Sequence, residues 1–184
     1  MTSYRIALIP GSLRKDSFNR RLALAIGKLL PDGFDTVMVD IGVLPLYSED
    51  DDSAPAPAVT HFKATIAEAQ GVLFVTPEYN RSIPGVLKNA IDHGSRPAGK
   101  SVWAGKPAGI AGVSPGSLGT ALAQQHLRNV LSHLDLPTLN APELFLRYRD
   151  DLFDADGALA RGSTRDLVST WVQRYAAWVR LHAA

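Results

Sequence analysis

Short apolar runs alternate along the chain with stretches in which apolar residues recur every three or four positions. The run at 71–76 is apolar almost throughout, as in the centre of a sheet. Leu22, Ala25, Ile26 and Leu29 recur at the spacing of an amphipathic helix that ends before Pro31. The pattern predicts strands over 4–9, 34–39, 71–76 and 106–114, a broken fifth strand within 136–146, and helices over 18–30, 59–69, 85–93, 118–133 and 164–181.

Single helices separate these strands, which is typical of βαβ units in a parallel sheet covered by helices on both faces. Five strands in 184 residues suit the flavodoxin-like order 2-1-3-4-5. We therefore expect an α/β fold with a doubly wound, five-stranded parallel sheet, formed by one domain over 1–184. Ligands of such sheets bind beyond the carboxyl ends of the strands, where the strand order reverses.

Composition and charge narrow the class of protein. Hydrophobic residues make up 46% of the chain and charged residues 20%, as in ordinary globular proteins. The chain has no cysteine, which excludes disulfides, thiol nucleophiles and cysteine-ligated metals, and its five histidines lack metal-ligand spacing. A net charge of +1 provides no field to gather nucleic acid or a membrane surface. Without a membrane-spanning run or a signal peptide, we expect a cytoplasmic protein without a metal.

The loop after the first strand reads Gly11-Ser12-Leu13-Arg14-Lys15-Asp16-Ser17-Phe18-Asn19. It opens a helix, whose free N–H groups and positive dipole end favour an anion. Arg14 adds a guanidinium that fits phosphate. The loop is neither a P-loop nor a G-x-G-x-x-G loop, which favours a single terminal phosphate over a pyrophosphate. Alternatively, Ser17 only caps the helix and Arg14 is a solvated charge.

The loop after the third strand reads Pro77-Glu78-Tyr79-Asn80-Arg81-Ser82-Ile83-Pro84-Gly85. Such a stiff loop can hold backbone N–H and C=O groups against the edge of a flat heterocycle, with Tyr79 near the ring and the Asn80 amide beside it. Ser82 is expected to cap the next helix, with Pro84 near its start. Alternatively, the loop is a simple connector in which Tyr79 is buried.

The loop after the fourth strand reads Ser114-Pro115-Gly116-Ser117-Leu118-Gly119 and also opens a helix. Gly116 and Gly119 let the backbone approach a ligand closely, although a plain connector would have the same composition. A positive dipole end beside a ring that becomes anionic on reduction would favour its reduced form. Three such loops at one sheet edge fit one phosphate and one planar ring, which describes flavin mononucleotide (FMN).

Two of these segments resemble a known family. GSLRKDSFN at 11–19 is similar to the phosphate loop of the NADPH-dependent FMN reductase family, and PEYNRSIPGVLKNAID at 77–92 is similar to its ring-binding loop and following helix. The resemblance covers nearly the whole chain and is nearest to the chromate and quinone reductases, with bacterial ferric reductases and azoreductases also similar. It implies a homodimer, often a tetramer, with one FMN per subunit. It also implies ping-pong hydride transfer from NADH or NADPH to quinones, chromate, ferric chelates, azo dyes or free flavins.

The resemblance also implies roles for individual residues. The residues implied to bind the cofactor are Gly11, Ser12, Arg14, Ser17, Phe18 and Asn19 toward the phosphate and ribityl chain, Pro77, Glu78, Tyr79 and Asn80 along the isoalloxazine, and Ser114, Gly116 and Gly119 at its pyrimidine end. No catalytic side chain is expected, because the flavin carries the chemistry. We expect Glu78 to organise its loop or to meet the partner subunit.

Two arginines and an acidic run are more open to interpretation. Position 81 is Arg where some relatives carry an aromatic residue, and Arg81 and Arg96 are candidates to contact an anionic donor or acceptor. The alternative for each arginine is an ordinary surface role. The acids at 49–52 form a solvated loop, or lie near the flavin of the other subunit.

Two other functions compete with a reductase. A flavodoxin-type electron carrier would dock redox partners without its own turnover, but such carriers are usually strongly acidic and use an uncharged phosphate loop. The net charge of +1 and Arg14 therefore favour the reductase. A flavin-binding module without useful turnover is the third hypothesis. The choice between NADH and NADPH, between acceptors, and between dimer and tetramer stays open at this stage.

Overall fold

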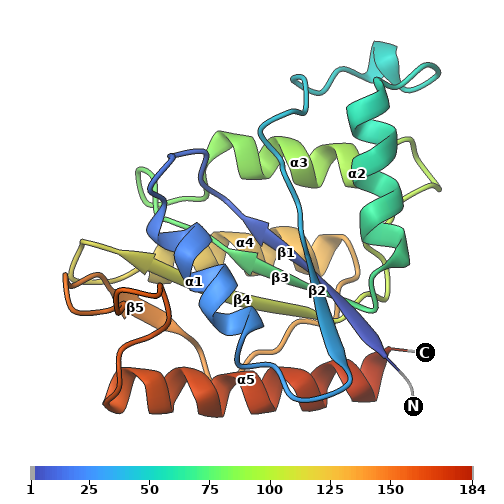
Figure 1. The fold of residues 1–184 in the computed structure, drawn as a ribbon. Coiled ribbons are helices and arrows are strands. Elements are labelled where there is room, and N and C mark those ends of the chain that lie inside the picture. Colours follow the sequence, from blue (N-terminus) through green and yellow to red (C-terminus); the bar gives the residue numbers. More distant parts are fainter. Residues whose placement is uncertain (1–2, 184) are drawn as a thin grey trace.

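The computed structural model describes residues 3–183, so residues 1–2 and 184 at the ends of the expected domain lie outside the described residues. Figure 1 shows a central sheet with helices on both sides. All neighbouring strands are parallel and lie in the order β2-β1-β3-β4-β5, which confirms the flavodoxin-like α/β fold. The strands are β1 (Tyr4–Pro10), β2 (Phe34–Met38), β3 (Gly71–Val75), β4 (Ala108–Ser114) and β5 (Phe145–Arg147).

Helices follow the predicted segments with shorter ends in two cases. They are α1 (Phe18–Gly27), α2 (Pro57–Glu68), α3 (Gly85–Ser95), α4 (Ala121–His133) and α5 (Ser163–His182), with a short 3-10 helix η1 (Glu49–Asp51) in the acidic run. The helix expected over 18–30 ends at Gly27, because the chain tightens into i→i+3 hydrogen bonds at Leu29 and Leu30. The helix expected over 118–133 begins at Ala121, because Gly119 adopts a φ of +59° that ends any helix there.

The fifth strand is the shortest element of the sheet. It covers three residues at the end of the segment where a broken strand was expected, and it extends one residue beyond it. Upstream, an isolated bridge joins Thr138 to Ala108, and the Gly112 N–H of β4 donates to the Leu144 carbonyl (3.3 Å). The strand expected over 106–114 also begins later, at Ala108. The fifth strand therefore pairs with the carboxyl end of β4, from Gly112 to Ser114.

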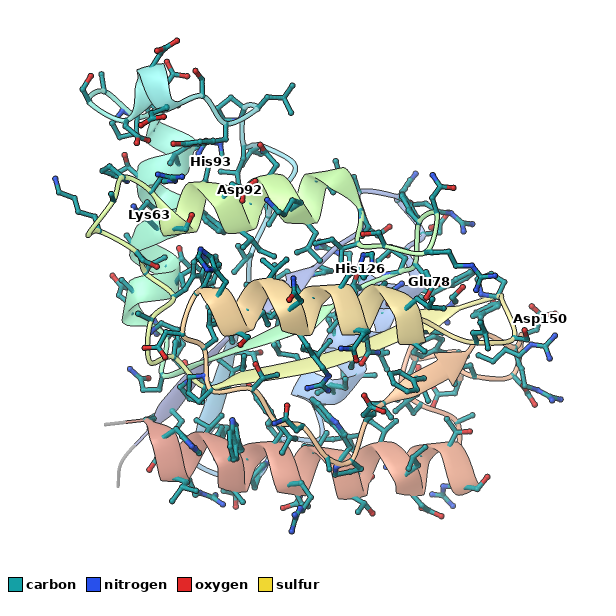
Figure 2. All side chains as sticks on the ribbon, turned by 180° about the vertical axis from the view of Figure 1, so that it is seen from behind. Lys63, Glu78, Asp92, His93, His126 and Asp150 are labelled. Atoms are coloured by element: carbon teal, nitrogen blue, oxygen red, sulfur yellow. The ribbon has the colours of Figure 1, made fainter. Side chains whose placement is uncertain are left out.

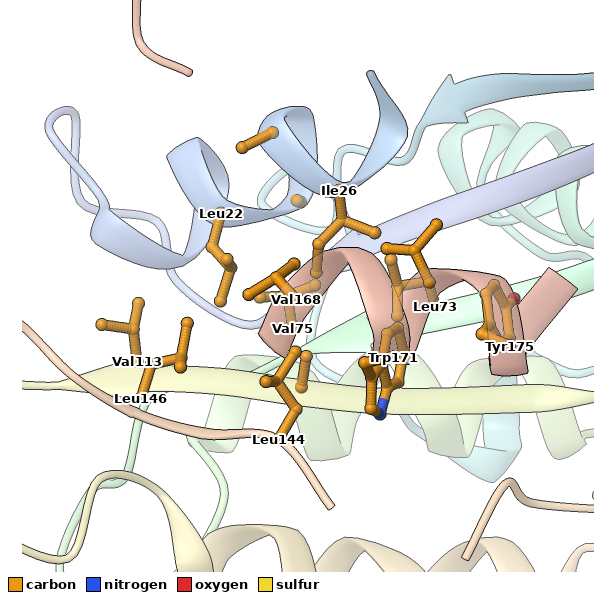
Figure 3. Packing of buried hydrophobic residues seen from close by; sticks show 14 of the residues in the cluster. Leu22, Ile26, Leu73, Val75, Val113, Leu144, Leu146, Val168, Trp171 and Tyr175 are labelled. Atoms are coloured by element: carbon orange, nitrogen blue, oxygen red, sulfur yellow. The ribbon is translucent and has the colours of Figure 1, made fainter. Parts of the chain in front are cut away.

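Two hydrophobic cores sandwich the sheet. In β3, Leu73 and Val75 face the helices α1 and α5, whereas Val72 and Phe74 face α2, α3 and α4. Figure 3 shows the first core from close by, where α1 and α5 enclose the side chains of β3 and β4. This alternation is the period of two that a strand buried on both faces requires.

The glycines and alanines of β4 make room for large rings on α5. A Cβ atom at Gly109 would lie 2.8 Å from the ring of Tyr175. Trp171 and Tyr175 stack with ring centroids 5.4 Å apart, and the Tyr175 hydroxyl donates a hydrogen bond of 2.7 Å to the Val72 carbonyl. Burial raises the pKa of Tyr175 well above its usual range. None of the helices described over 3–183 is long and apolar enough to cross a membrane.

Candidate functional site

Three loops begin side by side at the carboxyl edge of the sheet. The Gly11 N–H at the end of β1 donates to the Val75 carbonyl (2.9 Å), and the Thr76 N–H after β3 donates to the Ala111 carbonyl of β4 (3.0 Å). The Tyr148 N–H after β5 donates to the Ser114 carbonyl (2.9 Å), which extends the row to the other end of the edge. The strands therefore bring the three predicted ligand loops together, as the topology required.

The first loop combines a capped helix with an open anion position. The Ser17 hydroxyl accepts a hydrogen bond from the Arg20 N–H (3.2 Å) and caps α1, while the first turn of α1 contains no acidic residue. The positive end of α1 is therefore uncompensated by its own side chains. Arg14 is exposed and its guanidinium carbon lies 5.0 Å from the centre of the Phe18 ring. The cap and the anion position are compatible, since the cap uses only one N–H group.

Phe18 has a partner that the sequence did not reveal. Its ring stacks on Tyr148, with centroids 3.6 Å apart and planes inclined by 15°. Tyr148 therefore touches both the first loop, through this ring, and the third loop, through its bond to Ser114. No spacing in the sequence links positions 18 and 148, because the contact depends on where β5 ends.

Two predicted cofactor residues of the first loop also have structural roles. Asn19 is buried, its Nδ2 donates to the Val113 carbonyl and its Oδ1 accepts from the Val113 N–H, both at 2.9 Å. The amide therefore ties α1 to β4, and the implied role of Asn19 toward the FMN phosphate and ribityl chain stays a prediction. Gly11 packs closely on α3, since a Cβ atom there would lie 3.0 Å from Leu87.

The second loop is a tight hairpin. The N–H groups of Tyr79 and Ser82 each donate to the other residue's carbonyl at 2.9 Å, and Asn80 and Arg81 between them have φ values of 51° and 67°. Two successive positive φ values are the signature of a type I′ turn, for which Asn-Gly is preferred. The Tyr79 side chain is 54% exposed, so the alternative of a buried aromatic is wrong. Ser82 does not cap α3, whose N-cap is Pro84.

The hairpin is fastened to α4 at two points, which Figure 2 shows through the labelled Glu78 and His126. Glu78 Oε2 accepts hydrogen bonds from the N–H groups of Leu122 (3.0 Å) and Ala123 (3.2 Å) in the first turn of α4. His126 Nδ1 lies 2.9 Å from the Ser82 hydroxyl. The Thr120 hydroxyl accepts from the Gln124 side chain (2.9 Å) and caps no backbone N–H of α4, so the carboxylate of Glu78 takes the place of a local cap. Glu78 therefore organises its loop, as expected, and its implied place along the isoalloxazine stays a prediction.

The third loop lies against β5. The Ser114 hydroxyl accepts a hydrogen bond from the Gly116 N–H (3.2 Å). Gly119 has a φ of +59°, and a Cβ atom there would lie 3.2 Å from the Leu146 carbonyl oxygen. Both conditions restrict this position to glycine. Leu118 beside it is 52% exposed, so the loop presents backbone and one apolar side chain at the sheet edge.

Arg81 and Arg96 lie at opposite ends of α3. Arg81 is exposed at the tip of the hairpin before the helix, and Arg96 caps its carboxyl end. A helix of this length separates them by about 16 Å. Within one chain, the two arginines therefore do not face the same part of a ligand, and each is a candidate for a separate contact.

Arg96 lines a separate cavity of about 280 Å³ with Tyr47, Lys63 and His93. The Lys63 ammonium donates to the carbonyl oxygens of Arg96 and Lys100, and burial lowers the pKa of Lys63.

Burial and the neighbouring Asp52 raise the pKa of Tyr47, whose hydroxyl donates to that carboxylate (3.3 Å). Three of the acids at 49–52 are the η1 helix, and Asp52 is held by this hydrogen bond.

The residues at the sheet edge fit FMN. An uncompensated helix end with neutral donors suits a phosphate, and a glycine-restricted backbone beside a stiff hairpin suits the edge of a flat ring. Within residues 3–183, no three His, Cys, Asp or Glu side chains are placed to hold a metal ion. The helix end and the glycine-restricted backbone at this edge suit a flavin nucleotide as the reactive group.

Comparison with known proteins places the chain in a family. The model of the NADPH-dependent FMN reductase family matches residues 4–150. This chain belongs to that family. A 2-hydroxy-1,4-benzoquinone reductase of a Burkholderia species is 52% identical over 176 residues, covering 96% of each chain. A quinone reductase of Pseudomonas putida is 46% identical over 182 residues, covering 98% of this chain and 97% of its own.

Solved structures share this fold, and one of them is also similar in sequence. FerB, a flavoenzyme NAD(P)H:(acceptor) oxidoreductase of Paracoccus denitrificans, is 37% identical with a TM-score of 0.94, over 98% of this chain and all of its own. A Pseudomonas aeruginosa flavodoxin is 19% identical with a TM-score of 0.59, which shows the shared fold alone. Family membership confirms the resemblance, and with it an enzyme that uses NAD(P)H and FMN to reduce an acceptor.

Proposed function

We propose that this FMN-dependent oxidoreductase reduces quinones with NADH or NADPH in a ping-pong sequence. The observation that carries the proposal is the meeting of three ligand loops at one sheet edge, with the hairpin locked to α4 through Glu78. Relatives at 46% to 52% identity over nearly the whole chain carry the names of quinone reductases, which supports a quinone as acceptor.

We assign the phosphate of FMN to the first loop and the ring to the other two. Ser12, Arg14 and the start of α1 would hold the phosphate, with Ser17 and Phe18 shaping that end of the site. Pro77, Tyr79 and Asn80 would line one edge of the isoalloxazine. Ser114, Gly116 and Gly119 would flank its pyrimidine end. Bound FMN supplies the transfer of a hydride from the nicotinamide and on to the acceptor.

The protein's part in this chemistry is positioning and electrostatics. The hydrogen bonds of the hairpin fix the backbone of Tyr79 and Asn80. The N–H and C=O groups of these residues can therefore bind the flavin ring without rearrangement. The N-terminus of α4 directs positive partial charge toward the edge where the third loop lies, although Glu78 offsets part of it. Arg81 at the hairpin tip adds a full positive charge that would attract an anionic acceptor.

Assembly and location extend the proposal. We propose that the whole chain is one domain, that it forms a homodimer, often a tetramer, and that it works in the cytoplasm. The resemblance to the reductase family supports the assembly through α3 and α4. Sedimentation velocity of the purified protein would test it, and a monomeric FMN-loaded enzyme with full turnover would contradict it.

An anaerobic spectrum tests the reaction directly. The purified, FMN-loaded protein is mixed with NADH or NADPH without oxygen, and then with 1,4-benzoquinone. We expect prompt bleaching of the flavin absorbance, its return on addition of the quinone, and parallel lines in a double-reciprocal plot of the two-substrate kinetics. A protein that stays yellow with both coenzymes would favour the electron carrier and would contradict the proposal.

A further inference from the structure

A basic cavity lies beyond the end of β5. Its volume is about 310 Å³, and it is lined by Arg147, Arg149, Arg161, Asp151 and the start of α5. The three guanidinium groups come from two segments that are far from the three flavin loops along the sequence. The residues assigned above to the cofactor do not line it.

The local fold brings the three arginines together. Arg147 ends β5, and Arg149 follows two residues later, while Tyr148 between them packs on Phe18. Arg161 follows a small hairpin in which the Asp154 N–H donates to the Ala158 carbonyl (2.9 Å). The Ala160 N–H then donates to the Leu152 carbonyl (3.1 Å) and sets the next residue beside the cavity.

The charges around the cavity are poorly compensated. Arg149 pairs with Asp151 at 3.3 Å, but both side chains are about three-quarters exposed, so the pair is weak and can be displaced. Among the residues that the structure describes, no carboxylate oxygen lies within 4.0 Å of the guanidinium nitrogens of Arg147 or Arg161. Guanidinium groups bind phosphate oxygens through paired N–H donors, so the cavity suits a phosphate monoester.

The cavity adjoins the proposed flavin site through one residue. Tyr148, which separates Arg147 from Arg149, stacks on Phe18 of the first loop and donates its N–H to Ser114 of the third loop. The cavity is therefore next to the loops that we assign to the flavin. The group that distinguishes NADPH from NADH is a phosphate monoester on its adenosine ribose.

We propose that Arg147, Arg149 and Arg161 form a phosphate-monoester site that binds the 2′-phosphate of NADPH and makes the enzyme prefer NADPH to NADH. The assignment to the coenzyme rests on the proposed function. Free inorganic phosphate shares the same chemistry, and the experiment below separates the two sources.

Coenzyme kinetics of two variants test the site. Arg161→Ala and Arg147→Ala are compared with the wild type as FMN-loaded proteins at saturating benzoquinone, with Arg174→Ala as the matched control on the exposed face of α5. Loss of one arginine–phosphate contact should lower the ratio of kcat/KM for NADPH to that for NADH by about tenfold. The control should keep the wild-type ratio. Because Arg147 and Arg161 belong to separate segments, a folding defect in one variant leaves the other as a test.

Inhibition separates the coenzyme from free phosphate. Adenosine 2′,5′-bisphosphate should inhibit the wild type about tenfold more strongly than AMP, and Arg161→Ala should lose this difference. If inorganic phosphate binds the wild type but not Arg161→Ala while the coenzyme ratio is unchanged, the site is real and its ligand is free phosphate. If neither phosphate probe distinguishes the variants from the wild type, the site is overturned.

Two further outcomes would also overturn the inference. A variant that releases FMN, measured by its absorbance per subunit, would mean that these arginines hold the cofactor's phosphate. An equal loss of the ratio in Arg174→Ala would mean a general effect of charge. If the wild type oxidises neither NADH nor NADPH, the proposed function fails, whereas normal oxidation with an unchanged ratio refutes only the coenzyme assignment.

Discussion

The carboxylate of Glu78 and the backbone N–H of Leu122 are joined by a 3.0 Å hydrogen bond, although 44 residues separate them along the chain. Glu78 lies directly before the hairpin after β3, and Leu122 lies in the first turn of α4 after the third loop. One side chain thus connects the two loops that we assign to the flavin ring. Glu78 therefore has a structural role.

Replacing Glu78 by alanine should affect stability and cofactor binding together. The first turn of α4 would lose two acceptor contacts and a favourable charge at its positive end, which costs about 1–2 kcal/mol of the free energy of unfolding. The hairpin would also lose one of its two anchors, so we expect FMN to bind more weakly. Urea unfolding and fluorescence titration with FMN measure the two effects. Glu68→Ala, on the exposed end of α2, should change neither.

Arg81→Gly should stabilise the protein. Arg81 has a φ of 67°, a conformation that costs a non-glycine residue free energy, and the type I′ turn prefers glycine there. We expect the midpoint of urea unfolding to rise, corresponding to about 0.5–1 kcal/mol. The same variant removes the positive charge, so KM for an anionic acceptor should rise more than KM for a neutral quinone. A loss of stability would show that the arginine side chain, and not the backbone, determines the turn.

Gly94→Ala should be strongly destabilising, whereas Gly85→Ala on the same helix should not. A Cβ atom at Gly94 would lie 2.4 Å from the buried indole of Trp103, which donates its ring N–H to the Ile91 carbonyl. Overpacking of this kind costs about 1–3 kcal/mol. Nothing lies within 4 Å of a Cβ atom at Gly85. Thermal unfolding of both variants gives the comparison, and equal losses would contradict the packing of α3 on Trp103.

Tyr175 should make the folded state sensitive to alkaline pH. Burial raises the pKa of this phenol in the folded chain, while the unfolded chain ionises it near its usual value of about 10. Above that pH the unfolded state binds fewer protons than the folded state, so the free energy of unfolding falls as pH rises, by up to about 1.4 kcal/mol per pH unit.

Tyr175→Phe separates this titration from the hydrogen bond. The variant should lose about 1 kcal/mol near neutral pH, because the bond to the Val72 carbonyl is missing. It should also show a shallower decline above pH 10 in urea unfolding measured at several pH values. Parallel curves for the two proteins would contradict the raised pKa.

The fold and the meeting of the three loops at one sheet edge were predictable because both depend on local patterns. The apolar run of β3 and the helical spacing of Leu22 and Ile26 are properties of neighbouring residues, and the parallel topology then determines which loops meet. The capping of α1 by Ser17 was predictable for the same reason, because the N–H group that it accepts from is only three residues away.

The bonding partners of Asn19 and Glu78 could not be predicted in this way, although Glu78 was expected to organise its loop. Each side chain bonds to backbone groups on a distant element, Val113 for the first and the start of α4 for the second. Backbone partners carry no residue signature, so no pattern of residue types reports them. The hairpin at Asn80 and Arg81 was missed because its second position lacks the glycine that marks such turns.

The paired hydrogen bonds between Asn19 and Val113 also limit how the site can adapt. They join the start of α1 to the end of β4, so the loop assigned to the phosphate and the loop assigned to the ring cannot move apart independently. The distance between the phosphate position and the ring position is therefore fixed. A ligand with both a phosphate and a ring at the right separation fills the site, whereas riboflavin, which has the ring and the ribityl chain but no phosphate, leaves the α1 end empty.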